Sequence, residues 1–237
     1  MLWLVALSAA ADPAAPLVSA IADGVHDETV STAVRLLLTF TGLSFLPGML
    51  LVMTPFVRFV VVLSMMRQAL GMNQSPPNQV IIGLSLFLSL MVMESTLTVS
   101  YQHGIEPFLS GQMAPMDAWN QAIEPVRGFM LANTRKADMM TMLQIAEMPR
   151  PDSLQQLSTA LVTSAFVLSE LKTAMVISVY VFVPFLVIDL VTSSVLMGLG
   201  MMMLPPTTIS LPFKLMVFVL TDGWGLLIRD MVQGIAR

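Results

Sequence analysis

The chain has 237 residues, of which 56% are hydrophobic and 11% charged, and its formal net charge is −4. With a mean hydropathy of +0.80, this composition excludes an ordinary soluble globule and indicates a membrane or membrane-associated protein. The negative charge and the lack of basic clusters argue against nucleic-acid binding, and the absence of cysteine excludes disulfides, thiol catalysis and thiolate metal sites.

Residues 1–31 combine a short apolar run with a polar stretch. The run MLWLVALSAA has the apolar core and small-residue end of a signal peptide, but no basic residue precedes it, since the first Lys or Arg is Arg35. Residues 11–31, with Pro13 and Pro16, are typical of a polar linker. We interpret 1–31 as a candidate signal peptide and linker, and whether the signal peptide is cleaved stays open.

The hydrophobic segments that follow are short, broken by proline or bordered by charge. As a helix, the uncharged run 80–93 would be about 21 Å long, shorter than the hydrocarbon core of about 30 Å. Residues 173–188 contain Pro184 and lie between Lys172 and Asp189. Charges and prolines at this depth are costly unless protein surrounds them. We therefore expect these segments to pack mainly against protein, in an oligomer.

A pattern of Leu-Gly-Met-x-x-x-Pro-Pro occurs twice, as LGMNQSPP at 70–77 and LGMMMLPP at 199–206. Glycine permits a tight turn and Pro-Pro stops helix continuation. The repeat predicts two helical hairpins, over 32–100 and 158–237. The first apex is polar, whereas the second places three thioethers where water cannot solvate them. The expected turn residues are Gly71, Pro76, Pro77, Gly200, Pro205 and Pro206.

Between the hairpins, residues 101–157 are the only soluble-looking stretch. Asp117 is expected to cap a helix, and a second amphipathic helix is expected over 137–146. If both hairpins enter the membrane from the side of this segment, their apices lie on the opposite side. Arg67 near the first apex favours cytoplasmic apices, and hence a periplasmic 101–157 segment. The first helix is expected to bury one face made of Trp119, Ala122, Ile123, Val126, Phe129 and Met130.

The sequence contains no recognisable pattern for catalysis or for cofactor binding. His26 and His103 have no companion at metal-ligand spacing and are interpreted as surface residues. No nucleophile motif and no glycine-rich phosphate loop occurs. Asp189 and Asp222 have no second carboxylate three or four residues away, so we favour helix capping or hairpin contacts for them over an ion site. We expect no cofactor, no metal and no catalytic residue, which argues against a membrane enzyme or ion carrier.

Several long stretches resemble the FliP family of flagellar export-gate subunits, which is sister to the SctR subunits of injectisome type III secretion. The resemblance runs in order from about residue 36 to about residue 230, and RQALG and PPNQV are closer to the flagellar branch. Glu94–Ser95 and Met175 depart from the family pattern. The matching stretches are FVRFVVVLSMMRQALGMNQSPPNQVIIGLSLFL (56–88), EPVRGFMLANTRKAD (124–138), SELKTA (169–174), PFLVIDLVTSSVLMGLGMMMLPP (184–206) and LPFKLMVFVLTDGW (211–224).

The resemblance implies an all-α fold of membrane-associated, kinked helical hairpins with a small helical periplasmic insertion. Copies of the chain, as a homopentamer, would form a ring or helical oligomer with FliQ and FliR. Its pore would pass unfolded flagellar proteins across the bacterial inner membrane within the flagellar basal body. FlhB and FlhA of the export apparatus and the lipid bilayer are further implied partners. An injectisome gate subunit is the alternative, and a purely structural basal-body scaffold is another.

The resemblance assigns the second apex to the pore. Met201, Met202 and Met203 would point into the channel and, with their copies, form a gasket. A ring of flexible apolar side chains excludes water and ions by dewetting, and methionine adapts to a passing chain of any sequence. The competing interpretation is that the three residues simply pack against a neighbour.

The resemblance also implies an ion pair between copies, formed by Glu170 and Lys214. Each is a lone charge beside an apolar run and needs a partner. Lys172, two residues from Glu170 and so on another helical face, is a weaker candidate. A bridge within one subunit is the alternative.

Overall fold

The computed structural model describes residues 36–37, 40–41, 44, 48–49, 51–72, 75–149, 153, 156–201 and 205–235. Internal contacts divide the chain into two compact units, Met1–Gly48 and Met49–Arg237, and the fold described here is that of the second. The expected signal peptide and linker lie outside the described residues. Every regular element in the described part of the second unit is a helix, which confirms the all-α expectation.

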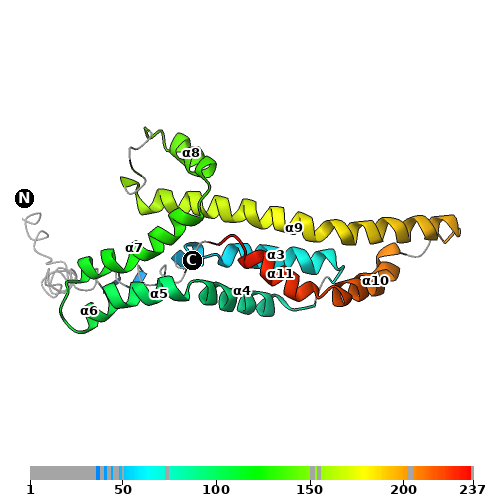
Figure 1. The fold of residues 1–237 in the computed structure, drawn as a ribbon, viewed down its shortest axis with the longest axis horizontal. Coiled ribbons are helices and arrows are strands. Elements are labelled where there is room, and N and C mark those ends of the chain that lie inside the picture. Colours follow the sequence, from blue (N-terminus) through cyan, green and yellow to red (C-terminus); the bar gives the residue numbers. More distant parts are fainter. Residues whose placement is uncertain are drawn as a thin grey trace, which may run out of the picture. The chain divides into compact units, whose positions relative to one another are not determined.

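Most helices follow one another with connections of a few residues, and the longest connection, residues 146–158, joins α8 to α9 (Figure 1). Helix α5 turns directly into a single π-helical turn, η1, before α6. In chain order the elements are α3 (Phe56–Ala69), α4 (Asn78–Val92), α5 (Glu94–Ser100), η1 (Tyr101–Ile105), α6 (Glu106–Leu109), α7 (Pro115–Asn133), α8 (Lys136–Ile145), α9 (Thr159–Gly198), α10 (Pro206–Leu220) and α11 (Gly223–Val232).

Helix α9 is the longest element, with 40 residues, or about 60 Å. Ser158 caps its start by accepting a hydrogen bond from the amide of Leu161. The helix continues through Pro184 and Asp189, so these residues border apolar runs in the sequence without ending the helix. Among the described residues, α9 is the one helix long and apolar enough to cross a membrane. Two bent pairs, α4 with α5–α6 and α10 with α11, raise that number to three if each pair forms one span.

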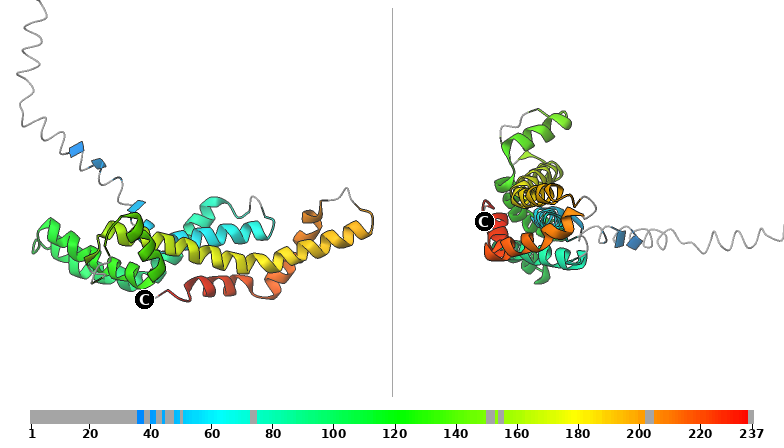
Figure 2. Two further views of the ribbon diagram at one scale, coloured as in Figure 1. Left: turned by 90° about the horizontal axis from the view of Figure 1, so that it is seen from above. Right: turned by 90° about the vertical axis from the view of Figure 1, so that its right-hand side faces the viewer.

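The core of this unit lies between α3 and α9, which run side by side (Figures 1 and 2). Phe59 and Met66 of α3 and Phe166 of α9 are fully buried there, and Phe129 of α7 meets Phe166 edge-on with ring centroids 6.1 Å apart. Burying each such side chain stabilises the fold by about 1.5–3 kcal/mol. Helices α10 and α11 run back along α9, and α8 packs against its first half.

The first hairpin turns between α3 and α4, and Arg67 holds this turn. Gly71 has φ +77°, the left-handed conformation that closes many helix C-termini. The Nη1 group of Arg67 donates to the Pro76 carbonyl at 3.0 Å and to Asn78 Oδ1 at 2.7 Å. Pro77 is the residue before α4. Arg67, considered in the sequence for its charge, thus ties both ends of the apex together.

Helix α7 begins two residues before the expected cap, so the assignment of Asp117 as N-cap is wrong. Proline is favoured at the first helical position, because its fixed φ suits the helix and its missing N–H is not needed there. Asp117 instead lies in the first turn, where a carboxylate interacts favourably with the helix dipole. Val126, Phe129 and Met130 are buried as expected, but Trp119 is 45% exposed. The second amphipathic helix is α8, within one residue of its expected bounds.

The hairpin formed by α5, η1 and α6 with α7 depends on one glycine. A Cβ on Gly104 would lie 2.6 Å from the carbonyl oxygen of Ala118 and 2.6 Å from the Cβ of Ala122. Because no real Cβ contact is that short, the π-helical turn and α7 approach each other only with glycine at this position.

Replacing Gly104 by Ala should push the hairpin apart and lower the free energy of unfolding by about 1–3 kcal/mol, the usual cost of overpacking. Thermal unfolding of the detergent-purified protein measures this loss. Gly128→Ala in α7 is the matched control, because a Cβ there meets nothing within 4 Å, and it should leave stability unchanged or slightly higher. Equal effects of the two substitutions would contradict the packing argument.

Candidate functional site

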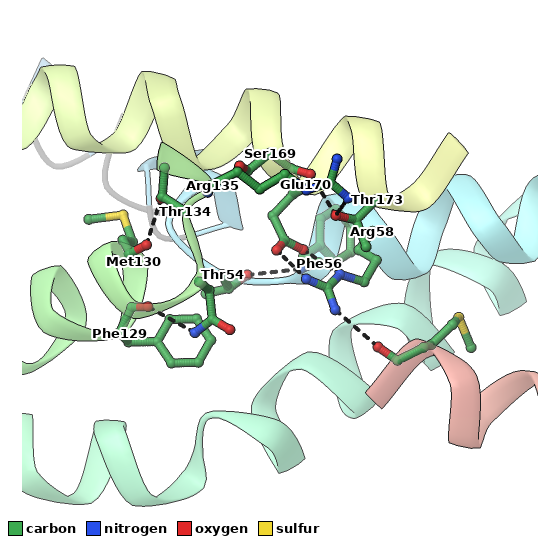
Figure 3. Close-up of polar contacts among 12 residues, drawn as sticks. Thr54, Phe56, Arg58, Phe129, Met130, Thr134, Arg135, Ser169, Glu170 and Thr173 are labelled. Atoms are coloured by element: carbon green, nitrogen blue, oxygen red, sulfur yellow. Dashed lines mark hydrogen bonds and ion pairs between the residues drawn. The ribbon is translucent and has the colours of Figure 1, made fainter. Parts of the chain in front are cut away.

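The interior contains a bidentate ion pair between Arg58 of α3 and Glu170 of α9 (Figure 3). The Nε group of Arg58 donates to Oε2 at 2.7 Å and Nη2 donates to Oε1 at 2.5 Å, while the side chains are only 4% and 1% exposed. The remaining Nη1 group donates to the carbonyl oxygen of Met231 in α11 at 3.3 Å. One guanidinium thus joins three helices through the fork geometry that only arginine offers.

A second buried cation, Lys214 of α10, has the same arrangement. Its Nζ lies 2.6 Å from Asp189 Oδ2 on α9 and donates to the carbonyl oxygen of Ala69, the last residue of α3, at 2.9 Å. The other carboxylate oxygen of Asp189 accepts a bond from the Ser210 hydroxyl at 2.6 Å. Hairpin contacts, favoured for Asp189 from the sequence, are therefore confirmed. Lys214 joins α10, α9 and α3.

A third cluster fastens α8 to α9 at Asp138. This carboxylate pairs with Lys172 and accepts a hydrogen bond from the Ser169 hydroxyl at 2.7 Å. The Ser169 oxygen in turn accepts the backbone N–H of Arg135 at 2.8 Å, whose guanidinium reaches Thr173 Oγ1 at 3.0 Å. Lys172, the weaker candidate for pairing between copies, therefore has a partner within the chain.

Burial alone would raise the pKa of Asp138. The hydrogen bonds from Lys172 and Ser169, with the charges of Lys172 and Arg135, outweigh it and hold the pKa of this carboxyl below its ordinary value of 3.8. The carboxylate therefore favours the folded state at neutral pH.

The structure places Glu170 and Lys214 in two separate ion pairs within one chain. Their pairing across copies stays a prediction, because a single chain does not test it. The sequence did not predict Arg58 as the partner of Glu170, which lies 112 positions away. The sequence does show that carboxylates in an apolar helix need cations as partners. In the structure these cations are Arg58 and Lys214, the two that are buried among the described residues.

Asp222 occupies the N-cap position of α11 but makes no capping hydrogen bond with its side chain. Its backbone is left-handed, with φ +49°, which is uncommon for a residue other than glycine. Asp222 therefore belongs to the bend between α10 and α11.

The second apex ends α9 in the same way as the first apex ends α3. Gly200 has φ +72°, and the amides of Gly200 and Met201 return to the carbonyls of Met197 and Leu196 at 3.0 Å each. Met201 is 42% exposed, whereas Met202 and Met203 lie outside the described residues. Pro205 precedes α10 and Pro206 is its first residue.

Beside this apex, α9 and α10 enclose a groove of about 450 Å³. The one polar side chain in its lining, Thr192, donates its hydroxyl to the carbonyl of Ile188 at 2.8 Å and so presents no free donor. The groove offers contact to apolar atoms only. Its lining residues are Val187, Ile188, Val191, Thr192, Val195, Leu196, Ile209 and Phe213.

Within the described part of the chain, no three His, Cys, Asp or Glu side chains lie close enough together to hold a metal ion. The buried acids Asp138 and Glu170 and the half-buried Asp189 each bind a cation already. What this arrangement does chemically is to fix helices against one another and to leave a thioether apex at the end of the longest helix.

Asp138→Asn should lower the free energy of unfolding by about 1 kcal/mol near neutral pH. The substitution removes the negative charge that attracts Lys172, and water screens this attraction only in part because the Asp138 side chain is buried. With a folded pKa below 3.8, the stabilisation by the carboxylate is fully present above pH 3.8 and is lost as pH falls through the folded pKa. Thermal unfolding of both proteins at pH 6 and pH 3 measures the difference. A difference that does not shrink at pH 3 would contradict the ion-pair account; Glu147→Gln, which removes an exposed carboxylate after the end of α8, is the control.

The FliP family model matches residues 38–231. The flagellar biosynthetic protein FliP of Bacillus subtilis is 44% identical over 206 residues, covering 87% of this chain and 93% of that protein. FliP of Pectobacterium carotovorum is 46% identical over 201 residues, covering 85% and 78%, and FliP of Caulobacter vibrioides is 43% identical over 237 residues, covering 99% and 89%. The chain therefore belongs to the FliP family.

Proposed function

We propose that this chain is a core subunit of the flagellar protein export gate in the bacterial inner membrane. Copies of it, with FliQ and FliR, line the pore through which unfolded flagellar proteins pass, and FlhB and FlhA contact the assembly. Family membership makes the chain a non-enzymatic component of the flagellar export apparatus. The relatives described above are flagellar biosynthetic proteins, which favours this gate over that of an injectisome.

The observation that carries the proposal is the thioether apex on α9. Met201 is exposed at the end of a helix long enough to cross a membrane, and the left-handed Gly200 and the Pro205–Pro206 pair stop both flanking helices there. The sequence of this turn offers no hydrogen-bonding side chain, so the exposed Met201 favours contact with apolar groups. In an oligomer those groups are the same methionines of other copies, which together close a pore by dewetting.

The surface of α9 supports an assembled state. Only 17% of its most hydrophobic 18-residue window is buried inside the single chain, and large side chains such as Tyr180, Leu190 and Met197 are more than half exposed. An apolar surface of this extent is covered by lipid or by other protein. The expected homopentamer, stacked with its partner subunits, provides such cover.

The pair between Glu170 and Lys214 of adjacent copies has a place in this proposal. Since Glu170 binds Arg58 and Lys214 binds Asp189 in the single chain, pairing across copies requires these contacts to exchange during assembly. The exchange keeps all four charges neutralised when Arg58 in turn pairs with Asp189 of the adjacent copy, since an unpaired buried charge is costly.

Changing Met201, Met202 and Met203 together to Ala should make the resting gate leak small ions while flagellar protein export continues. Alanine is too short and too stiff to close a ring that flexible thioethers fill. Ion conductance of cells or proteoliposomes containing the assembled gate measures the leak. Replacing the exposed Met216 of α10 by Ala is the matched control. Conductance equal to that of the unmodified gate would remove the gasket role.

Charge reversal tests the pair across copies. R58E/E170R keeps the pair within the chain but sets two cations opposite each other across copies, so it should abolish assembly. Adding D189K/K214E reverses the second pair as well, restores opposite charges across copies and should recover assembly. Native gel analysis of the purified complex gives the readout. Assembly of R58E/E170R by itself would assign Glu170 to Arg58 alone.

A further inference from the structure

Arg58 and Lys214 share a contact pattern that neither sequence nor family membership predicts. Each cation binds one carboxylate of α9 and one carbonyl oxygen at the C-terminal end of a different helix. For Arg58 that oxygen belongs to Met231, near the end of α11, and for Lys214 it belongs to Ala69, at the end of α3. A cation is favourable at a helix C-terminus because the unpaired carbonyls carry partial negative charge.

Both contacts involve the C-terminal arm, which we define as residues 206–235. The arm consists of α10 and α11, which meet at 66°. The bend is built tightly: a Cβ on Gly223 would lie 2.2 Å from the Phe218 ring, and one on Gly225 would lie 2.3 Å from the Asp222 carboxylate. Phe218 also contacts Trp224 edge-on, with centroids 5.5 Å apart. This elbow sets the point at which α11 turns away from α10.

The arm touches the rest of the unit along a narrow stripe. Opposite this stripe it is open to the surroundings, with Val219 and Leu220 more than 70% exposed. The two cationic contacts lie at separate places on the stripe, Lys214 on α10 before the elbow and Arg58 against α11 after it. The buried side chains of the arm within the described residues are Ser210, Lys214, Phe218, Leu227, Met231 and Ile235.

We propose that the C-terminal arm is held against α3 and α9 by these two clamps, and that Arg58 is a positioning residue for α11. Its fork is needed because two of its nitrogens are occupied by Glu170, and a third is left for Met231. A lysine neutralises the carboxylate but lacks this fixed third donor. Loss of the third contact frees α11, while Lys214 keeps α10 in place.

Because the C-terminal arm directly follows the methionine apex, its position would also orient the apex in a pore, and that part of the inference rests on the proposed function. The position of the arm itself depends only on contacts within one chain. Measuring it therefore tests the clamps whether or not the assembled protein conducts ions.

Two engineered cysteine pairs measure separately how close α10 and α11 lie to α9, through the rate at which each pair is cross-linked. The chain has no native cysteine to interfere. Tyr180 of α9 and Leu226 of α11 line one cavity of about 190 Å³, so the pair Y180C/L226C reports α11. Val191 of α9 and Phe213 of α10 line the groove beside the apex, so the pair V191C/F213C reports α10. A short bis-maleimide is applied to the full-length protein in detergent, and the cross-link within one chain is separated from dimers by gel mobility.

With Arg58→Lys, cross-linking of the α11 pair should slow about fivefold or more, the population change that losing one hydrogen bond produces, while the α10 pair reacts at its normal rate. Lys214→Gln should reverse this pattern. Arg58→Lys keeps the charge pair and so guards against a variant that fails to fold. Normal reaction of the α11 pair in Arg58→Lys would overturn the positioning role. Equal slowing of both pairs would overturn it as well, because it would reveal general loosening.

Discussion

A carboxylate on an apolar helix must be neutralised where it stands, and most of this structure follows from that constraint. Helix α9 carries Glu170 and Asp189 in surroundings too apolar for an isolated charge. Arg58 of α3 and Lys214 of α10 supply the cations. The two ion pairs decide which helices lie against α9, and where along it. Hydrophobic packing alone would leave α9 free to slide, since apolar contacts have little directional preference.

Helix α9 has two kinds of apolar surface, one covered by other helices of the chain and one left exposed. Its first half is covered by α3, α7 and α8, and the Asp138 cluster fixes α8 there. Its second half is exposed apart from α10 and α11. A subunit of this kind is stable as a helical unit and still incomplete, because an apolar surface of that size remains for neighbours or lipid. The thioether apex lies at the incomplete end. Charge pairing inside the chain and apolar contact outside it thus divide the tasks of folding and assembly.

Much of the fold could be predicted from the sequence because its signals are local. Gly71 and Gly200, each followed by Pro-Pro, specify turns through backbone conformation alone, and the faces of α7 and α8 follow from helical periodicity. The start of α7 was misplaced because a proline at the first helical position outweighs an acidic cap two residues later. The continuity of α9 through Pro184 and Asp189 was not predictable by the same rules, since neighbouring helices determine whether a proline or a charge is tolerated. The partner of Glu170 was missed for a related reason: pairing across 112 positions is set by tertiary packing and leaves no spacing pattern.

The central claim is that charges on α9 orient a hairpin whose methionines, from several copies, meet and close a pore. An electron cryomicroscopy map of the detergent-extracted complex tests this most directly. The account predicts that residues 201–203 of all copies converge on the central axis, with no solvent-filled gap between them. A map that places this stretch on the outer perimeter, in contact with lipid or detergent, would contradict it.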